Sequence, residues 1–177
     1  MTLPNRGKIF SEIVALADLA GDEIMKIYRG DMQIRQKADS SPVTAADEAA
    51  EEIILAGLRR LTPDIPIVAE EEAAAGKIVE VGDQPFWLVD PLDGTKEFIA
   101  YRDEFTVNIA LIENLSPTMG VVLAPAQDTS YAADGPGTAV RRIGNQTPQT
   151  ITTRRIPDQD VIATSSRSHG DKDKMQA

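Results

Sequence analysis

The sequence contains no cysteine and a single histidine, His169, which excludes several common catalytic and metal-binding arrangements. Without cysteine there is no disulfide, no thiolate nucleophile and no zinc–thiolate site. One imidazole cannot form a histidine cluster for a soft metal. Any catalysis therefore depends on carboxylates, hydroxyls or amines, or on a hard metal ion that is held by oxygen ligands.

Long apolar runs and a surplus of basic residues are also missing. No apolar stretch approaches the ~18 residues of a membrane-spanning helix, and the N-terminal residues lead into an amphipathic segment rather than a signal-peptide core. We therefore expect no transmembrane segment and a cytoplasmic protein, with a peripheral position at the inner membrane as an alternative. The 28 acidic and 18 basic residues give a net charge of −10, so nucleic-acid binding is not expected. A phosphorylated ligand stays compatible, because bound divalent cations invert the local field.

The chain begins with two helical patterns and continues with strands. Apolar residues recur at spacings of three and four from Ile9 to Tyr28, with Asn5 as a candidate cap, and again from Thr44 to Leu61. Short apolar strands are predicted at 67–69 and 86–89. From residue 104 the period changes to two, and short turns separate the further strands near 119–123, 130–133 and 138–142. This succession predicts an antiparallel meander.

Two helices packed on an antiparallel meander sheet define an α+β layer. We assign residues 1–143 to an N-terminal α+β domain that carries the metal-binding residues discussed below. Residues 144–160 form a linker or edge segment, and residues 161–177 form the start of a second domain that is incomplete. The strand near Val161 would leave an unpaired edge, which favours pairing with another chain, and a homodimer is one such arrangement.

The strongest chemical signal is the sequence DPLDGT at residues 90–95, directly after an apolar strand. Two carboxylates three residues apart suit Mg²⁺, which takes one or two carboxylates together with water and phosphate. The proline fixes its own backbone, so the turn could aim the Leu92 carbonyl at the same ion. Gly94 and Thr95 would open a helix whose free N–H groups suit a phosphate oxygen. The alternative is an ordinary strand-to-helix turn that Asp93 or Thr95 caps.

Three other groups of polar residues are weaker candidates. Glu70 could be a further metal ligand if the ends of the two apolar strands are neighbours, whereas the two glutamates that follow it are interpreted as a solvated acidic loop. Asp47 lies in the first turn of the second helix, where it either caps the helix or supports a metal site. Arg167 and His169 follow a strand and either contact an anionic group or belong to a polar loop.

Three stretches together resemble the inositol-monophosphatase superfamily of metal-dependent, lithium-sensitive phosphomonoesterases. They are Asp39-Ser-Ser-Pro-Val-Thr-Ala-Ala-Asp47, VAEEE at 68–72 and WLVDPLDGTKEF at 87–98. The TKEF continuation is similar to the CysQ-type 3′(2′),5′-bisphosphate nucleotidase branch. Three further stretches are also similar to this branch: FTVNIALI at 105–112, GVVLAP at 120–125 and SRSH at 166–169. The resemblance extends over roughly residues 8–170 and therefore covers nearly the whole chain.

The resemblance implies a layered α/β sugar-phosphatase fold with a larger N-terminal part and a smaller C-terminal part. It implies a Mg²⁺-dependent hydrolase of sulfur metabolism that acts on a small phosphorylated nucleotide. The expected reaction converts adenosine 3′,5′-bisphosphate to AMP and phosphate, and 3′-phosphoadenylyl sulfate is a further candidate substrate. Two alternatives stay open, an inositol- or sugar-phosphate phosphatase and a non-catalytic remnant that binds Mg²⁺ or phosphate.

The same resemblance implies a set of metal ligands for two or three Mg²⁺ ions. Glu70, Asp90 and the Leu92 carbonyl would hold one ion, and Asp90 and Asp93 would share a second. Such a two-metal arrangement places one ion on the attacking water and the other on the leaving oxygen. No imidazole or thiol is required, which agrees with the composition of the chain.

The resemblance also implies roles for the residues around the ions. Glu70 with Thr95 would orient the attacking water and relay its proton, and Asp47 would lie behind Thr95 and strengthen that relay. Gly94 and Thr95 would hold the phosphate. The expected substrate-binding residues are Asp93, Gly94, Thr95, Arg167 and His169.

The sequence departs from the family in its last third. Family members carry a Trp-Asp-x-Ala-Ala motif in the second domain, and the aspartate of that motif is a ligand of the second ion. Here Trp87 is the only tryptophan, and no acidic residue follows Asp173. We therefore expect an incomplete phosphatase that is active only if the missing piece is supplied. An incomplete gene, a shortened chain and a degenerate paralogue all fit this expectation.

Overall fold

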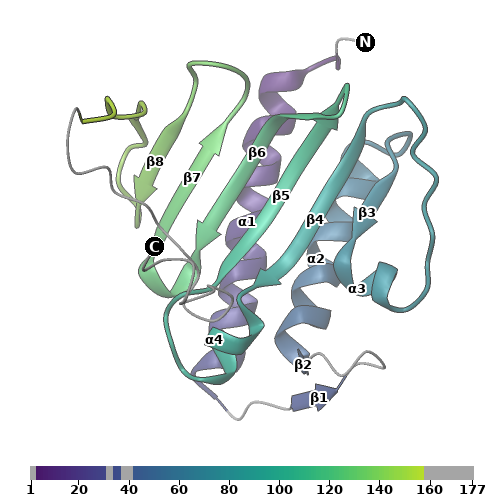
Figure 1. The fold of residues 1–177 in the computed structure, drawn as a ribbon, viewed down its shortest axis with the longest axis vertical. Coiled ribbons are helices and arrows are strands. Elements are labelled where there is room, and N and C mark those ends of the chain that lie inside the picture. The colour runs from purple at the N-terminus through teal and green to yellow at the C-terminus, as the bar shows by residue number, and fades with distance from the viewer. Residues whose placement is uncertain (1–2, 31–33, 37–41, 158–177) are drawn as a thin grey trace.

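The computed structural model describes residues 3–30, 34–36 and 42–157 of the 177-residue chain. Two long helices, α1 (Arg6–Tyr28) and α2 (Ala45–Leu61), pack against each other and cover one face of a seven-stranded sheet (Figure 1). The strands of this sheet, in spatial order, are β3 (Ile67–Ala69), β4 (Phe86–Asp93), β5 (Thr106–Glu113), β6 (Ser116–Ala124), β7 (Thr129–Ala133), β8 (Val140–Ile143) and β9 (Gln149–Thr150).

Five shorter elements complete the described part of the chain. β1 (Ile34–Gln36) and β2 (Pro42–Thr44) form a separate antiparallel pair before α2. α3 (Glu70–Ala74) follows β3, α4 (Thr95–Ile99) follows β4, and a 3₁₀ turn, η1 (Pro125–Gln127), precedes β7. α3 begins with the candidate acid Glu70, and α4 follows the strand that carries Asp90 and Asp93.

The predicted meander is confirmed, and the parallel pairing of β3 with β4 was not foreseen. From β4 to β9, each strand pairs antiparallel with the next one along the chain. β3 instead runs parallel to β4, with Ala69 opposite Val89. Residues 70–85 make the crossover that a parallel pair needs, and α3 lies in it. The sheet is therefore mixed at one edge, and both of the strands at this edge end at the same side.

The core lies between the two helices and the sheet. One alternating set of residues in this region, Phe105, Val107, Ile109 and Leu111, is at most 1% exposed. Such a side chain contributes roughly 1.5–3 kcal/mol when it is fully buried. Trp87 is also fully buried, and its indole N–H donates to the Thr62 hydroxyl at 2.9 Å. This contact ties the C-terminal end of α2 to β4, the strand that carries Asp90.

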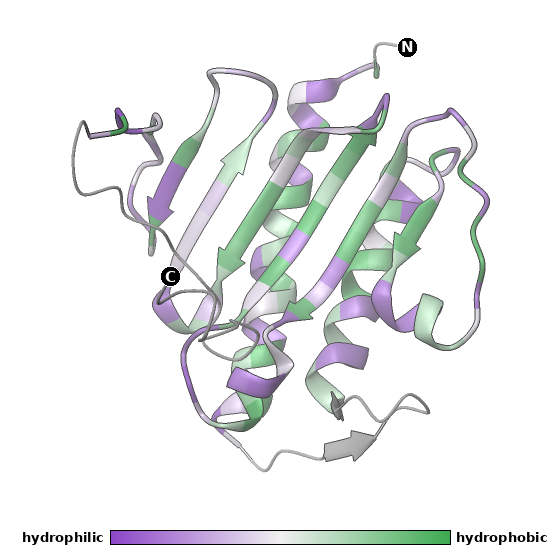
Figure 2. Cartoon of the chain, viewed as in Figure 1, coloured by the Kyte–Doolittle hydropathy of each residue, from purple (hydrophilic) through white to green (hydrophobic). Residues whose placement is uncertain are grey.

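The opposite face of the sheet carries no helix in the described part of the chain (Figure 1). Alternate strand residues point to this open face, and Leu88, Val122 and Tyr131 are 46%, 43% and 43% exposed. Apolar residues run along the central strands as well as along the helices (Figure 2). The two faces of the sheet therefore do not divide into one apolar and one polar face, although buried and exposed positions alternate along β5.

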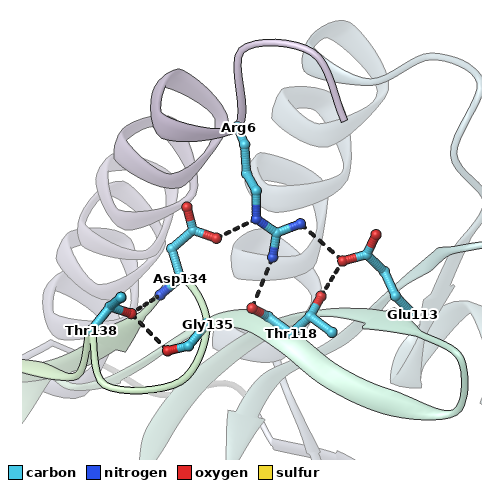
Figure 3. Close-up of polar contacts among 6 residues, drawn as sticks. All are labelled: Arg6, Glu113, Thr118, Asp134, Gly135 and Thr138. Carbon is cyan, nitrogen blue, oxygen red and sulfur yellow. Dashed lines mark hydrogen bonds and ion pairs between the residues drawn. The ribbon is translucent and has the colours of Figure 1, made fainter. Parts of the chain in front are cut away.

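Arg6 fastens the start of α1 to two turns of the sheet (Figure 3). Its guanidinium donates to Asp134 at 2.5 Å, to Glu113 at 2.9 Å and to the Thr118 carbonyl at 2.8 Å. The Thr118 hydroxyl donates to Glu113 as well. The Thr118 hydroxyl and, to a smaller extent, Arg6 hold the pKa of Glu113 below its ordinary value, although partial burial opposes them. The cluster joins α1 to the β5–β6 and β7–β8 connections.

Three details of the sequence prediction are corrected. Asn5 stands at the N-cap of α1, but its φ is 57° and its side chain makes no capping hydrogen bond to the described residues; its carbonyl accepts from Lys8 and Ile9 instead. The glutamate run predicted as a loop forms α3, because the chain turns helical directly after β3. β4 does not end at residue 89 but continues through Asp93.

Candidate metal and phosphate site

The parallel pairing of β3 with β4 brings Glu70 and Asp90 together. Ala69 is opposite Val89, so each acid is the next residue along its own strand direction. Parallel strands end at the same edge of a sheet, so side chains that are 20 positions apart meet there. The two carboxyl groups are close enough for Glu70 to raise the pKa of Asp90. The sequence made Glu70 a candidate ligand only if the ends of the two apolar strands are neighbours, and in the structure they are.

A β-bulge follows Asp90. β4 pairs Asp90 with Asn108 and Asp93 with Thr106, so three steps along β4 oppose two steps along β5. The extra residue breaks the alternation, and both residues between the two aspartates are buried. Bulges of this kind re-aim side chains next to functional sites. Here the bulge lets Asp93 reach the exposed end of the strand while Leu92 stays in the core.

Gly94 turns the chain from β4 into α4. Its φ of 93° lies in the left-handed region, which residues with a Cβ adopt at a cost. A Cβ at this position would lie 2.8 Å from the Glu104 carbonyl oxygen, so backbone also closes the space. Thr95 then begins α4, and its hydroxyl donates to the Leu92 carbonyl at 3.2 Å. The candidate carbonyl ligand and the candidate phosphate-binding hydroxyl are therefore in contact.

Asp90 lies at the electrostatic centre of the acidic residues. Burial, followed by the charges of Glu70 and Asp93, a hydrogen bond to Glu70 and the charge of Asp47, raises the pKa of Asp90 to about 7. Asp47 comes from the first turn of α2 and is only 1% exposed. Four acids from three elements thus interact at one edge of the sheet.

The Asp90 carboxyl has an oxygen that the described residues do not satisfy. Its Oδ1 is buried and finds no hydrogen-bond partner among them. A buried acceptor without a partner costs about 1–3 kcal/mol, and a cation would remove that cost. All the groups around Asp90 are oxygen donors of the kind that hard divalent cations prefer. The residues present therefore fit a Mg²⁺-type ion in their chemistry.

The acids among the described residues are not arranged as a complete set of metal ligands. Within residues 3–30, 34–36 and 42–157, no three acidic or histidine side chains are arranged so that they could hold a metal ion as they stand. Burial and the charges of Glu70 and Asp93 instead raise the pKa of Asp90, so a proton would compete with a cation for this carboxyl group. The structure thus brings Glu70 and Asp90 into contact and leaves Asp93 at the exposed end of β4.

The two glutamates after Glu70 differ from the solvated loop that the sequence suggested. Glu72 accepts from Arg59 on α2 and from Lys77, each at 2.6 Å. Glu51 on α2, which the sequence analysis missed, accepts from the backbone N–H groups of Glu71 and Glu72 at 2.8 and 2.9 Å. The sequence could have indicated Glu51, because it follows Asp47 by four residues and therefore lies on the same face of the helix. Arg167 and His169 lie outside the described residues.

The model of the inositol monophosphatase family matches residues 7–177. The chain therefore belongs to the inositol monophosphatase family. It is 53% identical over 130 residues to the 3′(2′),5′-bisphosphate nucleotidase CysQ of Salmonella typhimurium strain LT2, covering 72% of this chain and 52% of that protein. The CysQ of Escherichia coli K12 is 50% identical over 127 residues, covering 71% and 51%. The chain spans about half the length of these curated relatives.

Solved structures confirm the fold class. CysQ of Bacteroides thetaiotaomicron, described as a bacterial member of the inositol monophosphatase family, matches with a TM-score of 0.69 at 32% identity, covering 99% of this chain and 68% of that one. The suhB protein of Bartonella henselae matches with a TM-score of 0.68 at 28% identity, covering 84% and 56%. Enzymes of this family are metal-dependent. Among the helices of the described residues, none has the length and apolarity for crossing a membrane.

Proposed function

We propose that this chain is part of a cytoplasmic, Mg²⁺-dependent 3′(2′),5′-bisphosphate nucleotidase. Its reaction would release phosphate from adenosine 3′,5′-bisphosphate and leave AMP, and it would convert 3′-phosphoadenylyl sulfate to adenylyl sulfate in the same way. The observation that carries the proposal is the buried, unsatisfied oxygen of Asp90 beside Glu70, Asp93 and Asp47. About half of the aligned residues are identical to those of nucleotidases named CysQ, which supports the choice of substrate.

The proposal assigns the ion ligands by residue. Glu70, Asp90 and the Leu92 carbonyl would hold one Mg²⁺, and Asp90 and Asp93 would share another. When bound, such ions supply a water of lowered pKa and offset the negative charge of the phosphoryl group. The bulge in β4 supports this assignment, because it interrupts the regular alternation of side chains between Asp90 and Asp93.

The remaining work falls to protein groups around the ions. Glu70 would accept the proton of the attacking water, since it directly follows β3 and lies beside Asp90. The Thr95 hydroxyl, which now donates to Leu92, would orient that water, and Asp47 would keep the hydroxyl in place. The backbone N–H groups at Gly94 and Thr95 would hold a phosphate oxygen. Arg167 and His169 are proposed to contact the rest of the nucleotide.

Phosphate release from adenosine 3′,5′-bisphosphate in the presence of Mg²⁺ tests this proposal. Asp90→Asn keeps the size of the side chain and removes its charge, so we expect turnover to fall at least about a hundredfold, at the upper end of what lesser changes around metal ligands cost. Asp64→Asn is the matched control, because Asp64 is exposed beyond the end of α2. An inositol phosphate and a sugar phosphate assayed beside the nucleotide separate the alternative substrates.

Two results would overturn the proposal. Turnover that survives Asp90→Asn or the removal of Mg²⁺ by a chelator would place the chemistry elsewhere. A chain that binds Mg²⁺ and releases no phosphate above background would leave the non-catalytic alternative, a module that binds Mg²⁺ or phosphate.

A further inference from the structure

The first turn of α3 has N–H groups that its own N-cap cannot satisfy. The N-cap residue is Ala69, whose methyl group accepts no hydrogen bond. The first N–H groups of a helix have no partner within the helix, and a side-chain oxygen usually accepts from the second or third of them. In α3 these two positions are Glu71 and Glu72. The turn directly after Glu70 therefore needs an acceptor from another part of the chain.

Glu51 on α2 supplies this acceptor. The N–H of Glu71 donates to its Oε2 at 2.8 Å, and the N–H of Glu72 donates to its Oε1 at 2.9 Å. Each carboxylate oxygen thus takes one amide of α3, so the group fixes both the position and the rotation of the turn. Glu51 is only 4% exposed, and a buried carboxylate is tolerated where it is hydrogen-bonded in this way.

A second tie between α2 and α3 among the described residues is weaker. Arg59 on α2 donates to the Glu72 side chain at 2.6 Å, but the arginine side chain is 52% exposed. Exposed ion pairs contribute little, because water and salt screen them and long side chains lose freedom. Lys77, which pairs with the same carboxylate, is 51% exposed. The contact that holds the turn in the interior is therefore the one made by Glu51.

We propose that Glu51 is a positioning residue for the metal site: by holding the first turn of α3, it keeps the carboxyl group of Glu70 directed at Asp90. Glu51 itself does not contact the ions or the phosphate. The inference rests on the proposed function, since it takes Glu70 to be a metal ligand. Groups that orient metal ligands commonly change metal affinity 10–100-fold when they are lost.

Glu51→Gln tests the inference through metal binding, without any need for turnover. The amide has the shape of the carboxylate, but its NH₂ group would face one of the two backbone donors. We expect the Kd for Mg²⁺, measured by calorimetry or by competition with Tb³⁺ luminescence, to rise about tenfold. Glu52→Gln is the control, because Glu52 is exposed on the same helix and loses the same charge; its Kd should change less than about twofold.

A rescue separates positioning from general stability. In the Glu51→Gln background, Ala69→Ser places a hydroxyl at the N-cap of α3, where the backbone is extended with φ −123° and ψ 147°, as capping requires. We expect this hydroxyl to accept from the same two amides and to restore part of the Mg²⁺ affinity. If the Glu51→Gln chain has no cooperative melt, the titration is made on Glu51→Asp. This shorter carboxylate can reach only one of the two amides, and a several-fold loss is expected.

The outcomes distinguish this inference from the proposed function. If Asp90→Asn abolishes Mg²⁺ binding while folded Glu51→Gln or Glu51→Asp binds as tightly as the unmodified chain, the positioning role is wrong and the metal site stands. If Glu51→Gln weakens binding and Ala69→Ser restores none of it, the effect does not pass through the first turn of α3 and the inference fails. If the unmodified chain binds no Mg²⁺, or binds it equally well after Asp90→Asn, the proposed function and this inference fall together.

Discussion

Two separate features of the structure require glycine at position 94. Its φ of 93° is costly for any residue with a Cβ, and that Cβ would also lie 2.8 Å from the Glu104 carbonyl oxygen. We expect Gly94→Ala to lower the free energy of unfolding by about 2–4 kcal/mol, from roughly 1–2 kcal/mol of left-handed backbone strain and a further 1–2 kcal/mol or more of overpacking. Urea unfolding measures the loss.

Gly76 provides the control for this substitution. Its φ is 88°, and a Cβ there would meet nothing within 4 Å. Gly76→Ala therefore carries the backbone strain without the steric contact, and its loss should stay near 1–2 kcal/mol. Equal losses at the two positions would show that the approach of β5 to the turn does not matter.

Single residues also show how far the sequence could be interpreted. The DPLDGT turn identified Asp90 and Asp93, because oxygen ligands at a strand end are a local pattern. Glu51 was missed because its partners are backbone amides 20 and 21 positions away, and no local pattern records them. Asn5 was assigned a side-chain cap on residue type alone. Its left-handed backbone directs the carbonyl, rather than the amide side chain, at the helix.

At the scale of elements, the cluster around Arg6 should make stability depend on pH. The pKa of Glu113 lies below its ordinary value, chiefly through the hydrogen bond from Thr118 and also through Arg6, despite partial burial. A depressed carboxyl pKa contributes stability that is present above the ordinary glutamate pKa and is lost as the pH falls through the depressed value. We expect Glu113→Gln to cost about 0.5–1.5 kcal/mol near neutral pH, because these groups are partly exposed.

This cost should disappear in acid. Unfolding free energies at about pH 6.5 and about pH 3 would show the difference between the unmodified chain and Glu113→Gln shrinking toward zero. Glu12→Gln, on the exposed side of α1, should show little difference at either pH. A difference that is the same at both values would mean that the Glu113 charge does not stabilise the fold. Arg6 and Asp134 are the other charged groups of this cluster.

The elements themselves were predicted unevenly, for a physical reason. β5 alternates between a fully buried and a partly exposed face, so its period of two is visible in the sequence. β3 has only three residues, and three apolar positions cannot reveal the direction of their partner strand. The parallel pairing depends on the 70–85 crossover, whose short helix was interpreted as a loop. The sequence thus identified which residues form the candidate site, but it gave less information on how they are arranged in space.

At the scale of the whole molecule, the excess of acids should influence stability over long distances. The net charge of −10 produces self-repulsion in the compact state. The screening length falls from about 30 Å at 0.01 M salt to about 8 Å at 0.15 M. We expect the Tm to rise by about 2–4 °C on going from low to physiological NaCl, which corresponds to roughly 1 kcal/mol for a chain of this size.

This measurement needs a chelator, because traces of divalent cations would bind the acidic edge and raise the Tm for a different reason. A neutral osmolyte at the same osmolality is a useful comparison, since it does not screen charge. A Tm that falls with added NaCl would show that attractive pairs such as Arg6–Glu113 outweigh the overall repulsion.

The proposed division of the chain at residues 143 and 160 stays a prediction. Within the middle segment, β9 pairs with β8 as the last strand of the sheet. The segment proposed to begin a second domain, residues 161–177, lies outside the described residues, as does the edge expected near Val161. The chain covers 52% and 51% of the two CysQ proteins compared above. The activity of a whole enzyme is therefore tested best beside one of these relatives in the same assay.

The indole of Trp87 gives the molecule a built-in optical probe. It is the only tryptophan, it is fully shielded from water, and it lies opposite Ile67 in the strand pair that brings Glu70 and Asp90 together. Its emission will therefore be blue-shifted while β3 and β4 stay paired and will move to the red when they separate. Fluorescence of the unlabelled chain thus reports on the part of the sheet that positions the carboxylates, independently of how the rest of the molecule melts.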